Sequence, residues 1–380
     1  MSDEQVMTNA RIVTRHAVVE GSVRIGCGTI TAIDEGDMHA CGAVDWEGDY
    51  LLPGLIELHT DNLEKHLMPR PKVRWPEFPA LIAHDAEVAA AGITTVFDAL
   101  GVGDVDESGL RGQDLAGVLA VIDRAIRAEL LRADHRVHVR CELAAPNTVT
   151  LFQPFADHPL VGLISLMDHT PGQRQWTNLE QARIYYTGKK GWSDDKFHRV
   201  VGASRALQEK YALPHRRHFL GYAQDRAIPL ASHDDTTVSH VEQALDEGIT
   251  ISEFPTTEEA AHAARSRSIG IVMGAPNVVR GGSHSGNVGA VELACKGLLD
   301  VLSSDYVPSS LLHAAFMLTG QAGFSVPDAI ATVRSNPARL AHLIDRGEIA
   351  CGKRADLCRV RLTSDGPTVL AVWREGRRVV

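Results

Sequence analysis

Two side chains that could bind a metal ion follow directly on an apolar stretch of the sequence. The segment LLPGLIELHTD ends in His59 and Asp61, which are separated by a single residue. Imidazole nitrogen and carboxylate oxygen together suit zinc, manganese or iron. Because residues two apart on a strand point to the same side, this pair is predicted to deliver two ligands to one site.

Acids and histidines also close several other apolar segments of the chain. In a barrel of parallel strands the active site lies at the carboxyl ends of the strands, so side chains from distant segments meet there. A rim of salt bridges and helix caps without metal is the alternative interpretation. The predicted metal ligands are His59, Asp61, Glu142, His169, His233 and Asp305.

The elements that must carry these residues alternate along the chain. Strand-like segments such as TTVFDAL, VHVRCEL and GIVMGAPN are separated by helix-like segments such as LAGVLAVIDRAIRAELLRA. Eight strands of this kind predict an α/β protein built as a TIM-like (β/α)8 barrel. A doubly wound open sheet is the competing topology.

Both ends of the chain have a different pattern, with short β-type runs broken by glycines and acidic turns. Neither end is long enough to form a stable domain by itself. We therefore expect residues 1–50 and 345–380 to pair into one composite β-sandwich domain. Residues 51–344 then form the barrel domain that carries the predicted metal ligands.

The composition limits the partners and the compartment. A net charge of −10 argues against nucleic-acid binding by bulk electrostatics. No apolar run approaches the roughly 20 residues that span a bilayer, and MSDEQVMTNA does not resemble a signal peptide. The six cysteines are scattered, as expected for reduced thiols. We predict a cytoplasmic protein without nucleic-acid or membrane partners; a homo-oligomer is compatible with the sequence.

The predicted ligand set suits hydrolysis. A bound metal lowers the pKa of water from about 15.7 toward 7 and so supplies hydroxide near neutral pH. Zinc, as one or two ions, is the predicted cofactor, with manganese or iron as alternatives. Asp305, on the last strand, is the predicted general base.

Longer motifs resemble the amidohydrolase superfamily, which comprises metal hydrolases with a (β/α)8 barrel and a small β-sandwich from both termini. PGLIELHTD, ASHDD, SSDY, SNPAR and GEIACGKRADL carry this resemblance. HTDNLEKHLMPRPKVRWP, SLMDHTPGQRQ, EFPTT and MGAPNVVRGGSHSGN are similar to one branch, the triphosphate diphosphatases of the carbon–phosphorus lyase pathway. That branch implies hydrolysis of a ribose 1-methylphosphonate 5-triphosphate to the 5-phosphate and pyrophosphate during phosphonate degradation.

Three departures from the wider superfamily leave the number of metal ions open. The first strand has His59-x-Asp61 where most members have His-x-His. No lysine lies between Lys72 and Lys189, which excludes a carboxylated lysine on the third and fourth strands, so the resemblance makes Glu142 the bridging ligand. The sixth strand ends in Glu253, where many relatives have histidine.

Cationic and glycine-rich loops follow several of the predicted strands. Arginine suits bidentate contact with phosphate, and glycines let backbone N–H groups approach phosphate oxygens. These loops predict a phosphorylated partner, and the resemblance implies that this partner is a small phosphorylated ribose. His284 is also a candidate donor to a phosphate oxygen, although a loop histidine that satisfies its own turn fits equally well. The predicted substrate-binding residues are Arg70, Lys72, Arg74, Arg174, Asn277, Arg280, Ser283 and His284.

Two other functions are compatible with such a barrel, because one fold supports many chemistries. One is a deaminase or deacetylase acting on a phosphorylated sugar or nucleobase, and the other is a scaffold without catalysis. Two polar residues are expected to have no chemical role: Asp85 as a helix cap or a partner of the helix dipole in the first turn, and His215 in a solvated basic turn.

Overall fold

The computed structural model describes residues 4–36, 42–70, 73–103, 115–174, 179–190, 192–283 and 286–380. The chain forms two compact units. The first comprises Met1–Asp98, Val121–Arg136 and Met273–Val380, and the second comprises Ala99–Ala120 and Val137–Val272.

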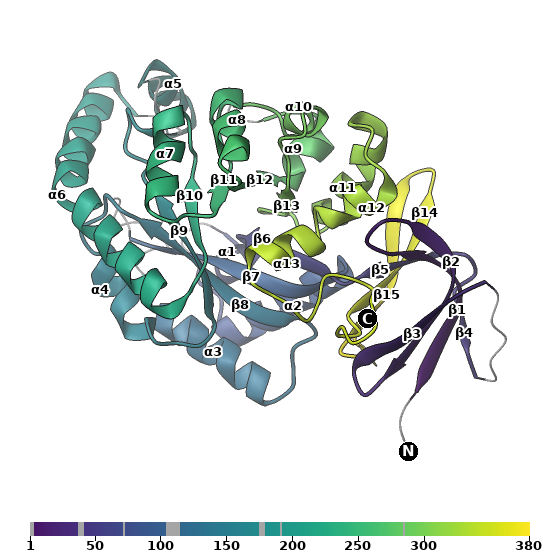
Figure 1. Cartoon of the computed structure of the whole chain (residues 1–380). Coiled ribbons are helices and arrows are strands. Elements are labelled where there is room, and N and C mark those ends of the chain that lie inside the picture. Colours follow the sequence, from purple (N-terminus) through teal and green to yellow (C-terminus); the bar gives the residue numbers. More distant parts are fainter. Residues whose placement is uncertain are drawn as a thin grey trace. The chain divides into compact units, whose positions relative to one another are not determined.

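Strands from both ends of the chain form one mixed sheet in the first unit, drawn in purple and yellow in Figure 1. Its order is β16-β15-β14-β5-β1-β2-β3, with β4 on β1. The rings of Trp46 and Trp373, which are distant in sequence, stack in its core with their centroids 5.4 Å apart. The strands are β1 (Gln5–Val13), β2 (Val18–Gly26), β3 (Thr29–Glu35), β4 (Val44–Asp45), β5 (Tyr50–Pro53), β14 (Leu357–Thr363), β15 (Gly366–Arg374) and β16 (Arg377–Arg378).

This sheet confirms that the two termini combine into one small β structure. β5 pairs antiparallel with β14, where Leu357 faces Pro53. β5 therefore runs past residue 50, and the domain boundaries at 50/51 and 344/345 stay a prediction.

Among the described residues, the second sheet has eight strands in the order β13-β12-β11-β10-β9-β8-β7-β6, which is the order of the chain. Thr60 and Asp305 bridge its first and last strands in parallel, as in a nearly closed barrel. The predicted (β/α)8 class is confirmed over the open doubly wound sheet. The strands are β6 (Leu55–Thr60), β7 (Ile93–Val102), β8 (Asp134–Glu142), β9 (Val161–Met167), β10 (Leu230–His233), β11 (Ile251–Glu253), β12 (Gly270–Gly274) and β13 (Val301–Ser303).

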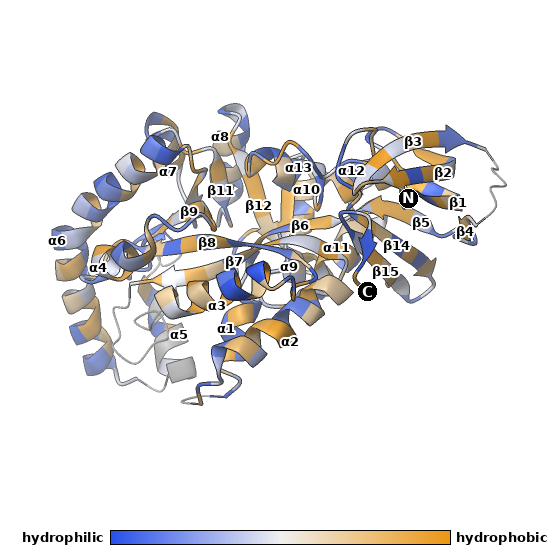
Figure 2. Cartoon of the chain, turned by 90° about the horizontal axis from the view of Figure 1, so that it is seen from below, coloured by the Kyte–Doolittle hydropathy of each residue, from blue (hydrophilic) through white to orange (hydrophobic). Residues whose placement is uncertain are grey.

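These strands form because they can be buried on both faces, as parallel sheets require. All ten residues of β7 and all six of β6 are buried. In Figure 2, β12 is orange, whereas helix α7 carries blue, hydrophilic turns. The polar residues of the buried strands therefore need partners that offset their burial.

Helices connect the strands, and several begin at residues that cap them. Thr237 and Thr257 accept hydrogen bonds from the backbone N–H groups of His240 and Ala260. In the described part of the chain, no helix combines the length and apolar character needed to cross a bilayer. The helices are α1 (Asn62–Leu67), α2 (Glu77–Ala90), α3 (Leu115–Arg127), α4 (Thr148–Phe152), the 3₁₀ helix η2 (Gln153–Phe155), α5 (Leu179–Lys190), α6 (Asp194–Arg226), α7 (Val238–Asp246), α8 (Glu258–Ser266), α9 (Ala275–Arg280), α10 (Ala290–Cys295), α11 (Ser310–Gln321), α12 (Val326–Ala331) and α13 (Ser335–Leu340).

The expectation for His215 is wrong. It lies inside α6, is buried, and its Nδ1 lies 3.1 Å from the carbonyl oxygen of Leu143. The hydrogen bond explains how the ring is buried, and the basic residues around it in PHRRHF misled the interpretation.

Candidate metal centre

The first cluster consists of His59, Asp61 and Asp305, and it lies where β6 and β13 meet. One ligand atom from each residue lies within 4.8 Å of the other two. Nε2 of His59 and Oδ1 of Asp61 are 3.6 Å apart. The structure thus brings together three of the predicted ligands from the two ends of the barrel sequence.

Backbone hydrogen bonds hold this cluster in place. The N–H of Asp305 donates to the carbonyl of His59 at 3.0 Å, and the N–H of Asp61 donates to the carbonyl of Asp305 at 2.7 Å. Asp305 has φ +55°, a left-handed conformation that costs energy for a residue with a side chain. Glu57 accepts hydrogen bonds from the N–H groups of His59 and Ser304, and burial raises its pKa to about 7.

The second cluster consists of His169, His233 and Asp234, at the ends of β9 and β10. Oδ2 of Asp234 lies 3.7 Å from Nε2 of His169 and 3.6 Å from Nε2 of His233. Both distances are too long for a hydrogen bond. The two imidazoles therefore direct Nε2 at one carboxylate oxygen without bonding to it.

Carboxylates behind this cluster orient both rings. Nδ1 of His169 lies 2.5 Å from Glu142, and Nδ1 of His233 lies 2.8 Å from Glu253. Since a carboxylate accepts, each Nδ1 donates, which leaves each Nε2 with a lone pair. This carboxylate–histidine arrangement is the one that orients metal ligands in proteins.

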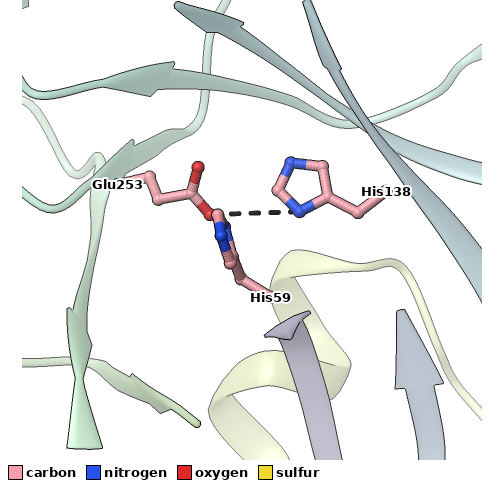
Figure 3. A group of neighbouring side chains, drawn as sticks. All are labelled: His59, His138 and Glu253. Carbon is pink, nitrogen blue, oxygen red and sulfur yellow. Dashed lines mark ion pairs between the residues drawn. The ribbon is translucent and has the colours of Figure 1, made fainter. Parts of the chain in front are cut away.

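His138 adds a further layer behind Glu253. In Figure 3, which also labels His59, the dashed line joins His138 to Glu253; their atoms are 4.0 Å apart. His138 and Glu253 are almost fully buried. Glu142, a predicted ligand, accepts hydrogen bonds from the backbone N–H of His169 and from the Nδ1 of the same residue.

The donors in both clusters fit a divalent metal. Ligands of a tetrahedral zinc ion lie about 2.0–2.1 Å from it, and hence roughly 3.4 Å from one another. The 3.6–3.7 Å separations are close to that value. Glu142, Asp234 and Glu253 are also buried carboxylates, and buried charge is costly unless a cation offsets it. The donor chemistry and the spacing both favour metal.

Arg174, a predicted phosphate ligand, is buried and already has partners. Its Nη1 donates to Asp235 at 2.6 Å and to the carbonyl oxygen of His233 at 3.0 Å. Asp235 also accepts from Ser232 and Ser252. The arginine thus fixes the backbone at the end of β10, next to the second cluster.

A third group, the imidazole network, joins His84, Asp98 and His135, all fully buried. Asp98 lies 2.6 Å from Nε2 of His84 and 2.8 Å from Nδ1 of His135. The amide nitrogen of Asn62 faces Nδ1 of His84 at 3.0 Å and also donates to Glu87. Nδ1 of His84 must therefore accept, so its Nε2 carries the proton and donates a hydrogen bond to Asp98. A neutral His84 cannot offer that nitrogen to a metal, and protons rather than an ion hold this network.

His135 lies between two carboxylates, because its Nε2 also faces Asp85 at 3.3 Å. Burial alone would lower the pKa of His135, but Asp98 and Asp85 outweigh burial and raise it to about 9. Burial would likewise raise the pKa of Asp98, yet His135 and His84 hold it well below its usual value. The expectation that Asp85 caps a helix is wrong: it lies inside α2 and binds the N–H groups of Arg132 and Ala133.

Of the remaining predicted substrate residues, the structure describes Arg70, Arg74, Asn277, Arg280 and Ser283. Arg70 and Arg280 are exposed, and exposed Arg74 forms an ion pair with Glu77. Oδ1 of Asn277 accepts from the N–H of Ala290, and Ser283 is half-buried. Lys72 and His284 fall outside the described residues. These residues retain their predicted role as proposals.

The sequence interpretation missed Asp234 and His138. Strand alternation predicts that Asp234 points away from its neighbour His233, but Asp234 has φ +56° and the chain turns there. His138 precedes Glu142 by four positions on β8, and such even spacing places both on one face. The spacing could have identified His138, whereas nothing in the sequence showed the turn at Asp234.

Comparisons with known proteins agree with this geometry. No family model matches the chain. A solved amidohydrolase superimposes with TM-score 0.63 and 14% identity, over 99% of both chains. The N-acetyl-D-glucosamine-6-phosphate deacetylase from Mycobacterium smegmatis superimposes with TM-score 0.62 and 16% identity, over 99% of this chain and 100% of the other. These likenesses show that the chain has the fold of the amidohydrolase barrels.

One curated relative is much more similar in sequence. The α-D-ribose 1-methylphosphonate 5-triphosphate diphosphatase of Escherichia coli K12 is 46% identical over 376 residues, which cover 98% of this chain and 100% of the relative. The chain belongs to the family of α-D-ribose 1-methylphosphonate 5-triphosphate diphosphatases.

The imidazole network predicts a loss of stability in alkaline solution. The folded pKa of His135, about 9, exceeds the ordinary value of 6.5, so its contribution is complete below pH 6.5 and is lost as pH rises through 9. In this window the free energy of unfolding should fall by up to about 1.4 kcal/mol per pH unit. Urea unfolding from pH 6 to 10 measures this slope. His135→Asn should be less stable at pH 6 and show a flatter slope; equal slopes in both proteins would contradict the assignment.

Proposed function

We propose that this protein hydrolyses α-D-ribose 1-methylphosphonate 5-triphosphate to the 5-phosphate and pyrophosphate in phosphonate catabolism, as a metal-dependent enzyme. The observation that carries the proposal is the 46% identity to the E. coli diphosphatase over nearly the whole chain. The two clusters support the metal-dependent chemistry. Five free thiols among the described cysteines support a location in the reducing cytoplasm.

Each cluster supplies a set of ligands for one divalent ion. His59, Asp61 and Asp305 would hold one ion, and the second cluster would hold another, with Glu142 as an additional ligand or as the partner of His169. We propose zinc, with manganese or iron as alternatives, because the donors are imidazole nitrogens and carboxylate oxygens. When bound, such an ion supplies the Lewis acidity that makes a water molecule acidic near neutral pH.

The protein's own groups complete the reaction. Water attacks the α-phosphorus in line with the departing pyrophosphate, and Asp305 accepts its proton. Asp305 suits this role because its strained backbone and its hydrogen bond to His59 fix its position. The substrate's negative charge would be neutralised by the cations and donors that the sequence predicts for this role, namely Arg70, Lys72, Arg74, Asn277, Arg280, Ser283 and His284.

Analysis of the products tests the function directly. The purified protein, supplied with Zn²⁺, should release pyrophosphate from the ribosyl triphosphate, and protein stripped with a chelator should not. Release of orthophosphate instead, or unchanged turnover after stripping, would contradict the proposal. Ammonia or acetate from a phosphorylated sugar would favour the deaminase or deacetylase alternative.

Replacement of the general base should separate chemistry from metal binding. Asp305→Asn keeps a ligand oxygen but cannot accept a proton, so kcat should fall about 10²- to 10⁴-fold. The bound metal, measured by elemental analysis, should remain close to the wild-type amount. Turnover within a few-fold of wild type would rule out this role for Asp305.

Removal of a phosphate contact should affect KM more than kcat. Arg280 is exposed at the end of α9, directly before Gly281 and Gly282. Arg280→Gln should raise KM for the triphosphate by about 10-fold, because a hydrogen bond to a charged group is lost. The matched control is Arg378→Gln, because Arg378 is an exposed arginine in β16. If both variants keep the wild-type KM, Arg280 does not contact the substrate.

A further inference from the structure

Glu57 is a fully buried carboxylate on β6, two residues before His59. Its Oε1 accepts from the N–H of His59 at 2.7 Å, and its Oε2 accepts from the N–H of Ser304 at 2.6 Å. Ser304 directly precedes Asp305. One carboxylate therefore binds the backbone beside two members of the first cluster, with one oxygen on each strand segment.

This position is costly for an acid, so its bonding has to be favourable. A buried carboxylate without partners is strongly unfavourable. Each oxygen of Glu57 accepts from a backbone N–H, one from His59 and one from Ser304. Buried N–H groups need an acceptor, and Glu57 supplies it for both. The Glu57 side chain therefore adds a second link between β6 and β13, in addition to the bridge between Thr60 and Asp305.

We propose that Glu57 is a positioning residue for the metal: it fixes the separation of His59 and Asp305 and thereby sets the metal affinity of the first cluster. The inference rests on the proposed function, which makes His59 and Asp305 ligands. The N–H of His59 belongs to the residue that carries one ligand, and the N–H of Ser304 lies one residue before the other. A change at Glu57 therefore moves both ligands without removing either.

The amide analogue isolates this role. In Glu57→Gln one acceptor oxygen becomes an NH₂ donor, which opposes a backbone N–H donor and releases one of the two strands. Mutations behind metal ligands typically weaken metal binding by about 10- to 100-fold. The variant should bind metal more weakly by this factor.

The test measures metal binding without substrate. Metal-free full-length protein is titrated with Co²⁺, whose d–d absorption band reports the ligand geometry, and then with Zn²⁺ in competition. The expected result for Glu57→Gln is about 10- to 100-fold weaker affinity and a shifted band. Affinity and band like those of wild type would overturn the inference and leave the proposed function intact.

Asp356→Asn is the matched control. Asp356 is also a buried carboxylate, and it accepts from the N–H of Glu375 and from Arg354, away from the clusters. The Asp356→Asn variant should have a lower unfolding temperature but the wild-type metal affinity. An equal loss of metal affinity in both variants would overturn the positioning role. If Glu57→Gln does not fold, Glu57→Asp, too short to reach both N–H groups, is measured and judged in the same way. A wild-type protein that binds neither metal would overturn the proposed function and this inference together.

Discussion

The need to offset buried carboxylates explains most of the polar structure in the barrel. Backbone N–H groups offset Glu57, Arg174 offsets Asp235, and the imidazolium of His135 offsets Asp98. Those contacts have hydrogen-bond length. The two clusters differ, because their Nε2 and carboxylate atoms lie 3.6–3.7 Å apart. Protons and arginines account for the first kind of contact, and a divalent cation best accounts for the second.

The backbone stores strain at the points where these groups must be placed. Asp234 and Phe254 directly follow strands of the parallel sheet, and Asp305 lies two residues after the last one; their φ values are 56°, 56° and 55°. Such left-handed residues turn the chain sharply and persist only where their surroundings enforce them. At Asp234 and Asp305 the turn brings a carboxylate into a cluster. The strain therefore serves the site, and the buried strands on either side supply the packing that holds it.

The sequence predicted the parts of the structure that depend on periodicity. All eight parallel strands were placed, and His59, Asp61 and Asp305 come together from strands at opposite ends of the sheet. The sequence did not predict features that depend on tertiary contacts. The turn at Asp234 breaks strand alternation, and Arg174 looks like a loop cation until Asp235 is seen beside it. The sequence shows that Asp234 and Arg174 are charged, but it does not show which groups they contact.

Fold similarity alone cannot select the reaction, because structures with 14–16% identity share this barrel and include a deacetylase. The ligand chemistry narrows the choice. Asp61 adds a carboxylate oxygen to the first cluster, and a negative ligand makes the site less attractive to a polyanion. In the proposed function, cations outside the clusters would attract the triphosphate, and exposed Arg70 and Arg280 would suit that role. Substrate choice would therefore reside in the loops, and the clusters would set only the hydrolytic chemistry.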